Sequence, residues 1–203
     1  MEIQQVFTHF ALQLKSQTPL DWAITLTALL YVWLAARESA WCWVSGIVSS
    51  GLWAWADFAR YNLWVDGLLQ VFYVLMGFVG LYAWLFAKQK NEAKLPIRRL
   101  PLRQHGLLWL AGGALTLSLG FLFQQYTSTS FPYADSFITA FSIIATFLTI
   151  KKVLENWLYW IVFDTLAIFL FWAKDAVLVA VVMVVYTAMA VYGYRKWKKE
   201  AVH

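Results

Sequence analysis

Long stretches of the chain contain no charged side chain, and this feature constrains the fold more than any other. A helix needs about 20 consecutive apolar residues to cross the hydrocarbon core of a bilayer. Seven segments approach this length, at residues 22–36, 39–56, 67–87, 106–124, 136–150, 156–173 and 176–194. None of them alternates polar and apolar residues as a membrane strand does. The sequence therefore predicts an all-α integral membrane protein with seven transmembrane helices.

The composition agrees with this fold class. Hydrophobic residues make up 62% of the 203 residues and charged residues only 13%, whereas soluble domains have roughly 45–50% and about 25%. So few charges leave too much apolar surface for a water-soluble globule. The single cysteine, Cys42, cannot form an internal disulfide.

The basic residues predict the orientation in the membrane. Of the 16 Lys and Arg residues, 13 fall on one side of a seven-span topology, and only Lys15, Arg60 and Lys174 fall on the other. By the positive-inside rule, the N-terminal segment 1–20 lies outside, while the basic loop 88–105 and the tail 198–203 lie in the cytoplasm. These basic runs are topology signals that face the lipid bilayer, so we expect no nucleic-acid partner.

The chain also repeats itself at a shift of about 114 residues. Two three-span units, residues 21–87 and 134–197, flank a connector helix at 106–126. Equivalent helices point the same way, so this is a parallel three-plus-one-plus-three repeat, an arrangement found in transporters. The equivalent pairs are Asp21 and Asp135, Arg37 and Lys151, Trp41 and Trp157, Tyr73 and Tyr186, Gly80 and Gly193, and Trp84 and Trp197.

Polar residues inside the sixth span mark a candidate substrate site. Asn156, Trp160 and Asp164 are spaced at i, i+4 and i+8 and share one helix face. At about 1.5 Å per residue, Asp164 lies near the bilayer midplane. A carboxylate at that depth is costly and indicates a function. The alternative is an Asp that is protonated or paired internally with a hydroxyl or an indole N–H.

The first unit offers a matching polar face. At a shift of 115 residues this face contains Ser45 and Ser49, with Trp53 beyond them, and the third span adds Gln70 and Tyr73. Helix packing and substrate contact are both open for these serines and for Gln70. A carboxylate among indole rings suits an organic cation. No basic residue lies mid-membrane, which disfavours phosphorylated ligands.

Enzymatic functions find no support. The three histidines, His9, His105 and His203, fall at or outside the membrane ends, so neither a catalytic triad nor a zinc motif forms. The sequence also lacks a glycine-rich phosphate loop with a lysine. We therefore expect no enzyme activity, no metal and no cofactor.

Several motifs resemble the PnuC family of vitamin transporters. The sequence LLQVFY at 68–73, followed by GLYAW at 80–84, is similar to the third span of that family. FPYADS at 131–136 and ENWLYW at 155–160 are similar to its second half. The resemblance covers residues 20–197.

The resemblance implies a seven-helix fold similar to the SWEET-type sugar carriers, assembled as a homotrimer in the bacterial inner membrane. It implies uptake of a non-phosphorylated vitamin by facilitated diffusion, with trapping by a cytoplasmic vitamin kinase. Asn156 and Trp160 match family positions associated with the ligand. Members that carry nicotinamide riboside typically have Asn at the position of Asp164 and another Asn near Ser49.

This departure at Asp164 bears on the cargo. An ionised carboxylate only accepts hydrogen bonds, and it suits the aminopyrimidine donors and the cationic thiazolium of thiamine. We therefore expect thiamine as the cargo. Nicotinamide riboside, which is also a cation, is the alternative, and a membrane scaffold subunit without transport activity is a third.

Overall fold

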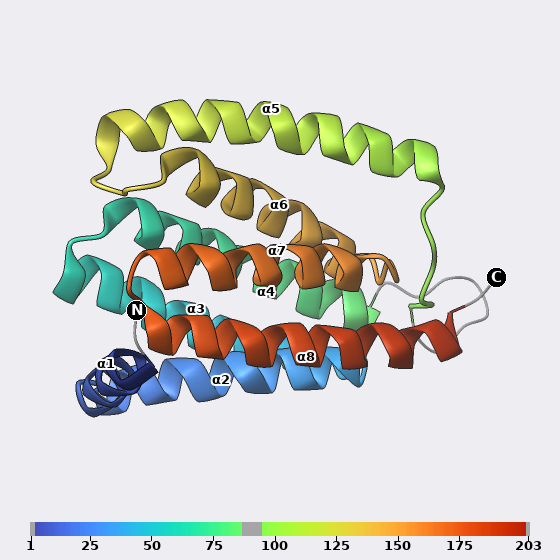
Figure 1. The fold of residues 1–203 in the computed structure, drawn as a ribbon. Helices are drawn as coiled ribbons and strands as arrows, with labels where there is room; N and C mark the ends of the chain where they lie inside the picture. The colour runs from blue at the N-terminus through green and yellow to red at the C-terminus, as the bar shows by residue number, and fades with distance from the viewer. Residues whose placement is uncertain (1–2, 87–94, 202–203) are drawn as a thin grey trace.

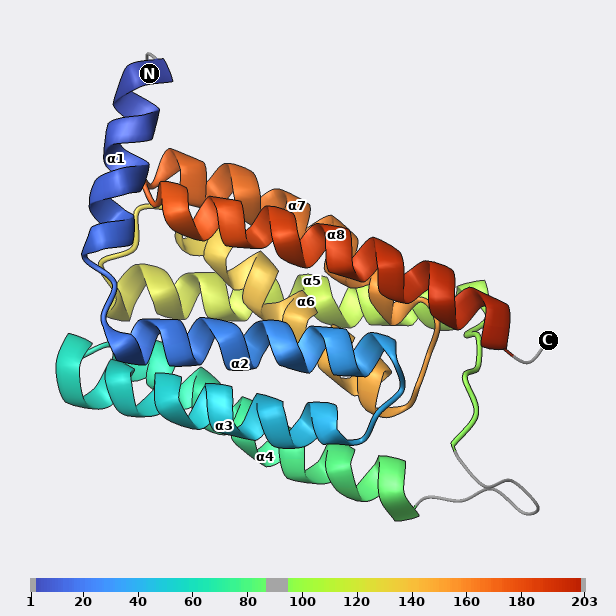
Figure 2. The same cartoon turned by 90° about the horizontal axis from the view of Figure 1, so that it is seen from below.

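The computed structural model describes residues 3–86 and 95–201, and these residues form eight α-helices and one π-helical turn (Figure 1). Helices α2 to α8 lie roughly side by side, whereas α1 is steeply inclined to them at the end where α2 begins (Figure 2). The elements are α1 (Ile3–Lys15), α2 (Pro19–Ala36), α3 (Trp41–Ala56), η1 (Asp57–Tyr61), α4 (Trp64–Phe86), α5 (Leu102–Tyr126), α6 (Pro132–Ile150), α7 (Asn156–Ala173) and α8 (Val177–Glu200).

Six of the helices are long and apolar enough to cross a membrane, namely α2 and α4 to α8. The remaining predicted span, 39–56, corresponds to α3, which has only 16 residues but continues directly into the π-helical turn η1. The chain is thus an all-helical, multi-pass membrane protein. A count of seven spans requires α3 and η1 to cross the membrane together.

The two shortest predicted segments are extended by their polar flanks. Helix α2 begins at Pro19, three residues before the apolar run. The hydroxyl of Thr18 accepts a hydrogen bond from the backbone N–H of Asp21, whose carboxylate accepts one from the backbone N–H of Thr18. This capping box satisfies donors that the first turn leaves free. Helix α6 likewise begins at Pro132, where the missing N–H costs nothing.

The helices pack as two groups of three. Helix α3 contacts both α2 and α4, and α7 contacts both α6 and α8, while α5 packs on α6. The two groups meet where α2 lies against α8 and where α4 lies against α6. A substrate site between the groups is therefore bounded by helices from both halves of the sequence.

Two segments differ from the sequence prediction. Within the predicted N-terminal segment 1–20, residues 3–15 form α1, and Gln13 attaches this helix to the turn between α7 and α8. Its Nε2 donates to the carbonyl of Asp175 at 2.6 Å, and its Oε1 accepts from the backbone N–H of Leu178 at 2.9 Å. In the predicted loop 88–105, residues 88–94 lie outside the described residues, and α5 already begins at Leu102.

Two tryptophan rings lie directly on glycines of the neighbouring helix. Trp43 of α3 covers Gly80 of α4, and Trp157 of α7 covers Gly193 of α8, so that a methyl group at either glycine would overlap the indole. Both indoles are buried, with exposures of 2% and 3%. The absence of a side chain at each glycine therefore sets how closely these helix pairs approach.

We expect Gly80→Ala to destabilise the protein, because the added methyl group collides with the buried Trp43 ring. Overpacking of this kind costs about 1–3 kcal/mol, and thermal unfolding in detergent measures the loss. Gly113→Ala in α5 is the matched control, since no neighbouring helix lies within 4 Å of a methyl group there. Equal melting temperatures for the two variants would contradict this packing.

Candidate functional site

A cavity of about 330 Å³ lies between the two helix groups, with walls from α2, α3, α4, α6, α7 and α8. Its volume falls at the lower end of the roughly 300–1,000 Å³ of small-molecule sites. All the residues that the sequence predicts to bind substrate line this one cavity: Ser49, Trp53, Gln70, Tyr73, Asn156, Trp160 and Asp164.

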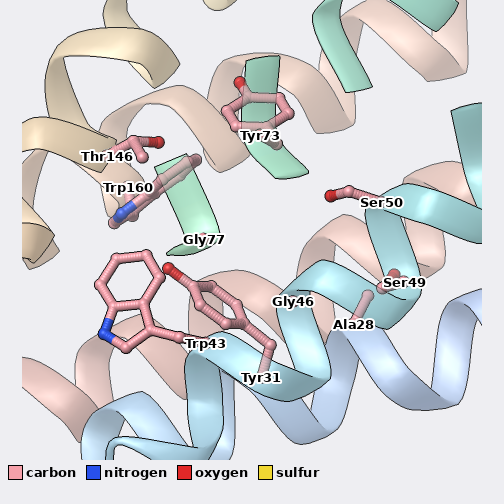
Figure 3. A pocket seen from close by; sticks show the side chains of 10 residues that line it. All are labelled: Ala28, Tyr31, Trp43, Gly46, Ser49, Ser50, Tyr73, Gly77, Thr146 and Trp160. Carbon is pink, nitrogen blue, oxygen red and sulfur yellow. The ribbon is translucent and has the colours of Figure 1, made fainter. Parts of the chain in front are cut away.

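A side pocket of about 160 Å³ adjoins the cavity. Figure 3 shows Tyr31 of α2 and Trp43 of α3 facing Trp160 of α7 across this pocket, with Tyr73 of α4 farther along its wall. The hydroxyls of Tyr31, Tyr73 and Thr146 give the apolar pocket a few polar groups. Aromatic faces with sparse hydroxyls are suited to a flat ring that carries hydroxylated substituents.

Asp164 brings a carboxylate into the cavity. Within residues 3–86 and 95–201, the two ion pairs join Lys152 to Glu38 and Lys174 to Asp135, at opposite ends of the helices. No hydrogen bond between described residues engages the Asp164 side chain, although the phenol of Tyr186 lines the same cavity. The described residues thus contain no hydrogen bond that pairs the Asp164 side chain internally, and the other alternative, a protonated Asp, stays a prediction.

Asn156, in contrast, is fully buried and hydrogen-bonded within the protein. Its Nδ2 donates a hydrogen bond to the carbonyl of Val153 at 2.5 Å, and its Oδ1 accepts one from the hydroxyl of Thr149 at 3.1 Å. The indole N–H of Trp160 donates to the same Thr149 hydroxyl at 3.5 Å. Thr149 therefore links Asn156 to the Trp160 ring at the cavity wall.

The serines of α3 serve helix packing. Ser45 Oγ donates to the carbonyl of Thr27 at 2.7 Å, and Ser49 Oγ donates to the carbonyl of Ile24 at 3.0 Å, both in α2. Ser49 also borders the cavity, but its hydroxyl hydrogen is already engaged. Of the two alternatives left open by the sequence, packing thus describes Ser45 fully and Ser49 in part.

The structure corrects one equivalence in the predicted repeat. Trp41 was expected to correspond to Trp157, yet Trp41 is 71% exposed, and Trp43 is the residue that covers a glycine as Trp157 does. With Trp43 as the counterpart, the shift is 114 residues and Ser50 corresponds to Asp164. Ser50 lines both the cavity and the side pocket.

Several cavity residues escaped the sequence analysis. Tyr31 and Met183 stand in apolar runs with no local signal, and the buried Thr149 stands at the end of one. Tyr186 did carry a signal, because it is the counterpart of Tyr73 at a shift of 113 residues. No group of three His, Cys, Asp or Glu side chains suitable for a metal occurs among the residues that the structure describes.

Comparisons with known proteins agree with this architecture. A family model described as nicotinamide mononucleotide transporter matches residues 18–199. The nicotinamide riboside transporter PnuC of Escherichia coli is 28% identical over 202 residues, covering 87% of this chain and 84% of that protein. The riboflavin/roseoflavin transporter RibM of Streptomyces davaonensis is 26% identical over 184 residues, covering 87% and 83%.

A solved structure is also similar. The crystal structure of the vitamin B3 transporter PnuC matches with a TM-score of 0.72 at 23% identity, covering 96% of this chain and 88% of that one. It shows that the fold is shared. These three relatives are named as transporters and not as enzymes.

We expect Thr149→Val to lower the free energy of unfolding by about 1–3 kcal/mol, because Asn156 Oδ1 and Trp160 Nε1 both lose their hydroxyl partner. Thermal unfolding in detergent measures the loss. Thr149→Ser keeps the hydroxyl and should melt close to the wild type. Equal stability of the Val and Ser variants would contradict a stabilising role for the hydrogen bonds that join Asn156, Thr149 and Trp160.

Proposed function

Because the chain belongs to the nicotinamide mononucleotide transporter family, the family of the PnuC proteins, we propose that it carries a non-phosphorylated vitamin across the membrane through the cavity between its two helix groups. Membership confirms the expected PnuC resemblance, and it favours transport over the scaffold alternative. One observation carries the site assignment. The Asp164 carboxylate lies in the wall of a cavity that also contains the Trp53 and Trp160 rings.

Nicotinamide riboside is the cargo that we propose. The relatives reported above are named for nicotinamide riboside and riboflavin, so they give the expected thiamine no support and favour the alternative. Between the two named vitamins, the charge of the site favours nicotinamide riboside. Nicotinamide riboside carries a pyridinium cation, which suits the carboxylate of Asp164 and the π-faces of Trp53 and Trp160. Riboflavin is uncharged at neutral pH.

The cavity residues divide the recognition between them. The Asp164 carboxylate faces the cationic ring and accepts a hydrogen bond from the carboxamide N–H₂. Trp160, held by Thr149 and Asn156, stacks on the ring, with Trp53 on the outer side. Gln70, Tyr73 and Ser49 on the opposite wall supply the polar contacts to the ribose hydroxyls.

Transport follows from movement of the two helix groups about this site. We assign residues 21–87 and 134–197 as the two units and 106–126 as the connector, acting as a homotrimer by facilitated diffusion, with a cytoplasmic vitamin kinase trapping the product. The charge pattern supports an orientation in the bacterial inner membrane with segment 1–20 outside. The loop 88–105 and the tail 198–203 then lie in the cytoplasm.

We expect calorimetric titration of the purified protein to show saturable binding of nicotinamide riboside, with weaker binding of thiamine and riboflavin. Asp164→Ala removes the countercharge and should weaken nicotinamide riboside binding about tenfold or more. Asp66→Asn is the matched control, because Asp66 lines a neighbouring pocket near Asn62 and Lys174 and does not line the cavity; it should bind like the wild type.

Two outcomes would contradict this proposal in different ways. Unchanged nicotinamide riboside affinity in Asp164→Ala would remove Asp164 from the site. Tighter binding of thiamine than of nicotinamide riboside by the wild type would leave the site in place and overturn the cargo.

A further inference from the structure

One end of the interface between the helix groups is closed by an ion pair between equivalent residues of the repeat. Glu38 follows α2, and Lys152 follows α6 at a shift of 114 residues, which is the shift of the repeat. Both adopt left-handed backbone conformations, with φ of 56° and 48°. Lys152 Nζ donates to Glu38 Oε2 at 2.8 Å, and the two side chains are only 2% and 15% exposed. The same structural position thus carries opposite charges in the two halves, and they meet.

Two tryptophans join the halves reciprocally beside this ion pair. The indole N–H of Trp84 in α4 donates to the carbonyl of Ile150 in α6 at 3.1 Å. The indole N–H of Trp197 in α8 donates to the carbonyl of Ala35 in α2 at 3.2 Å. In each case the third helix of one half binds the end of the first helix of the other half.

These contacts form a single buried cluster. The Trp84 and Trp197 ring centroids are 6.1 Å apart, and Lys152 Nζ lies 4.7 Å from the centroid of the Trp84 ring. Trp84 is 8% exposed and Trp197 is fully buried. The carboxyl group of Glu200 is hydrogen-bonded to Glu38 and lies near Lys152, so the ion pair belongs to a charge network beside the two indoles, and removal of one of its charges weakens that network. The ion pair and the two indole hydrogen bonds are therefore expected to break together.

The cavity is asymmetric with respect to this cluster. At the cluster end its wall includes Ala35 and Trp157, which belong to the same buried core as Trp84 and Trp197. Toward α1 it adjoins a further pocket of about 460 Å³, which is lined by Gln13, Gln17 and Lys174 and shares Trp53 and Tyr186 with the cavity. The cluster therefore lies between the cavity and the end of the helices that bears the basic last turn of α8.

We propose that Glu38, Lys152, Trp84 and Trp197 form the gate of the basic end, and that separation of the ion pair opens the cavity to that side in each transport cycle. This gate adds a moving part to the proposed transport function. It rests on that function in one respect, namely that the cavity holds the cargo. Opening of the gate is measurable without any cargo.

The test measures how fast a membrane-impermeant maleimide reaches a cysteine in the cavity. The Cys42→Ala background removes the native cysteine, and Ser50→Cys then places the reporter in the cavity wall. A second variant in the same background, Lys198→Cys, is labelled in parallel to show how much of the protein has its basic end facing the probe. Glu38→Gln and Lys152→Gln should each accelerate labelling of the reporter from that side by about tenfold. The exchange Glu38→Lys with Lys152→Glu should restore slow labelling, because it re-forms the ion pair with its two charges reversed.

A matched control breaks the ion pair at the other end. Lys174 Nζ lies 2.6 Å from Asp135 Oδ1, so Lys174→Gln also removes one salt bridge but leaves the gate intact. It should not accelerate labelling from the basic end. Should a charge variant fail to fold, Trp197→Phe keeps an aromatic ring but removes the N–H donor and part of the buried indole, and it should accelerate labelling as well.

Unchanged labelling in the folded gate variants would overturn the proposal, as would equal acceleration by Lys174→Gln. Failure of the exchange variant to restore slow labelling would contradict the pairing of Glu38 with Lys152. Titration of the same proteins with nicotinamide riboside separates the two proposals. Absence of binding by the wild type overturns the cargo and leaves the labelling result standing.

Discussion

The hydrocarbon core of the membrane is the constraint on which the rest of this structure depends. It supplies no hydrogen-bond partners, so every backbone N–H and C=O must be satisfied within the protein, and helices are the result. Lipid also provides no hydrophobic force between helices, so close packing holds them together. Trp43 on Gly80 and Trp157 on Gly193 show how this is done here, with a flat ring resting on a residue that has no side chain.

The same constraint divides the polar side chains into those that form hydrogen bonds within the protein and those that face the cavity. Ser45, Ser49 and Asn156 direct their hydrogen bonds to protein partners and so join or brace helices. Asp164 directs its carboxylate into a cavity instead, where a bound cation would compensate its charge. Among the described residues, one face of α7 thus carries a hydrogen-bonded amide and a carboxylate without a hydrogen bond. This contrast is the reason for the proposal that Asn156 positions the site and Asp164 binds the cargo.

Much of the fold could be predicted, because long uncharged runs leave few alternatives to a membrane helix. The starts of α2 at Pro19 and of α6 at Pro132 lie outside the predicted spans 22–36 and 136–150, because a search for uncharged apolar runs leaves out the polar residues that begin these helices. Helix α1 was missed because its 13 residues are too short to span and its anchor, Gln13, binds a turn more than 160 residues away. The candidate residues converge on one cavity because they share a face or a repeat position. The hydrogen bonds of Asn156 could not be predicted, because they depend on how the chain folds around it. Trp41 was taken as the counterpart of Trp157 in place of Trp43, because the repeat matches at shifts that differ by one or two residues.

The most direct test of the central claim is a counterflow measurement in proteoliposomes. Vesicles that contain the purified protein are loaded with unlabelled nicotinamide riboside and diluted into a trace of labelled nicotinamide riboside. A carrier with one exchanging site between two helix groups predicts transient accumulation of label that saturates with concentration and is lost in the Asp164→Ala variant. Entry of label at the rate of protein-free liposomes would contradict transport, and equal accumulation by the variant would contradict the site.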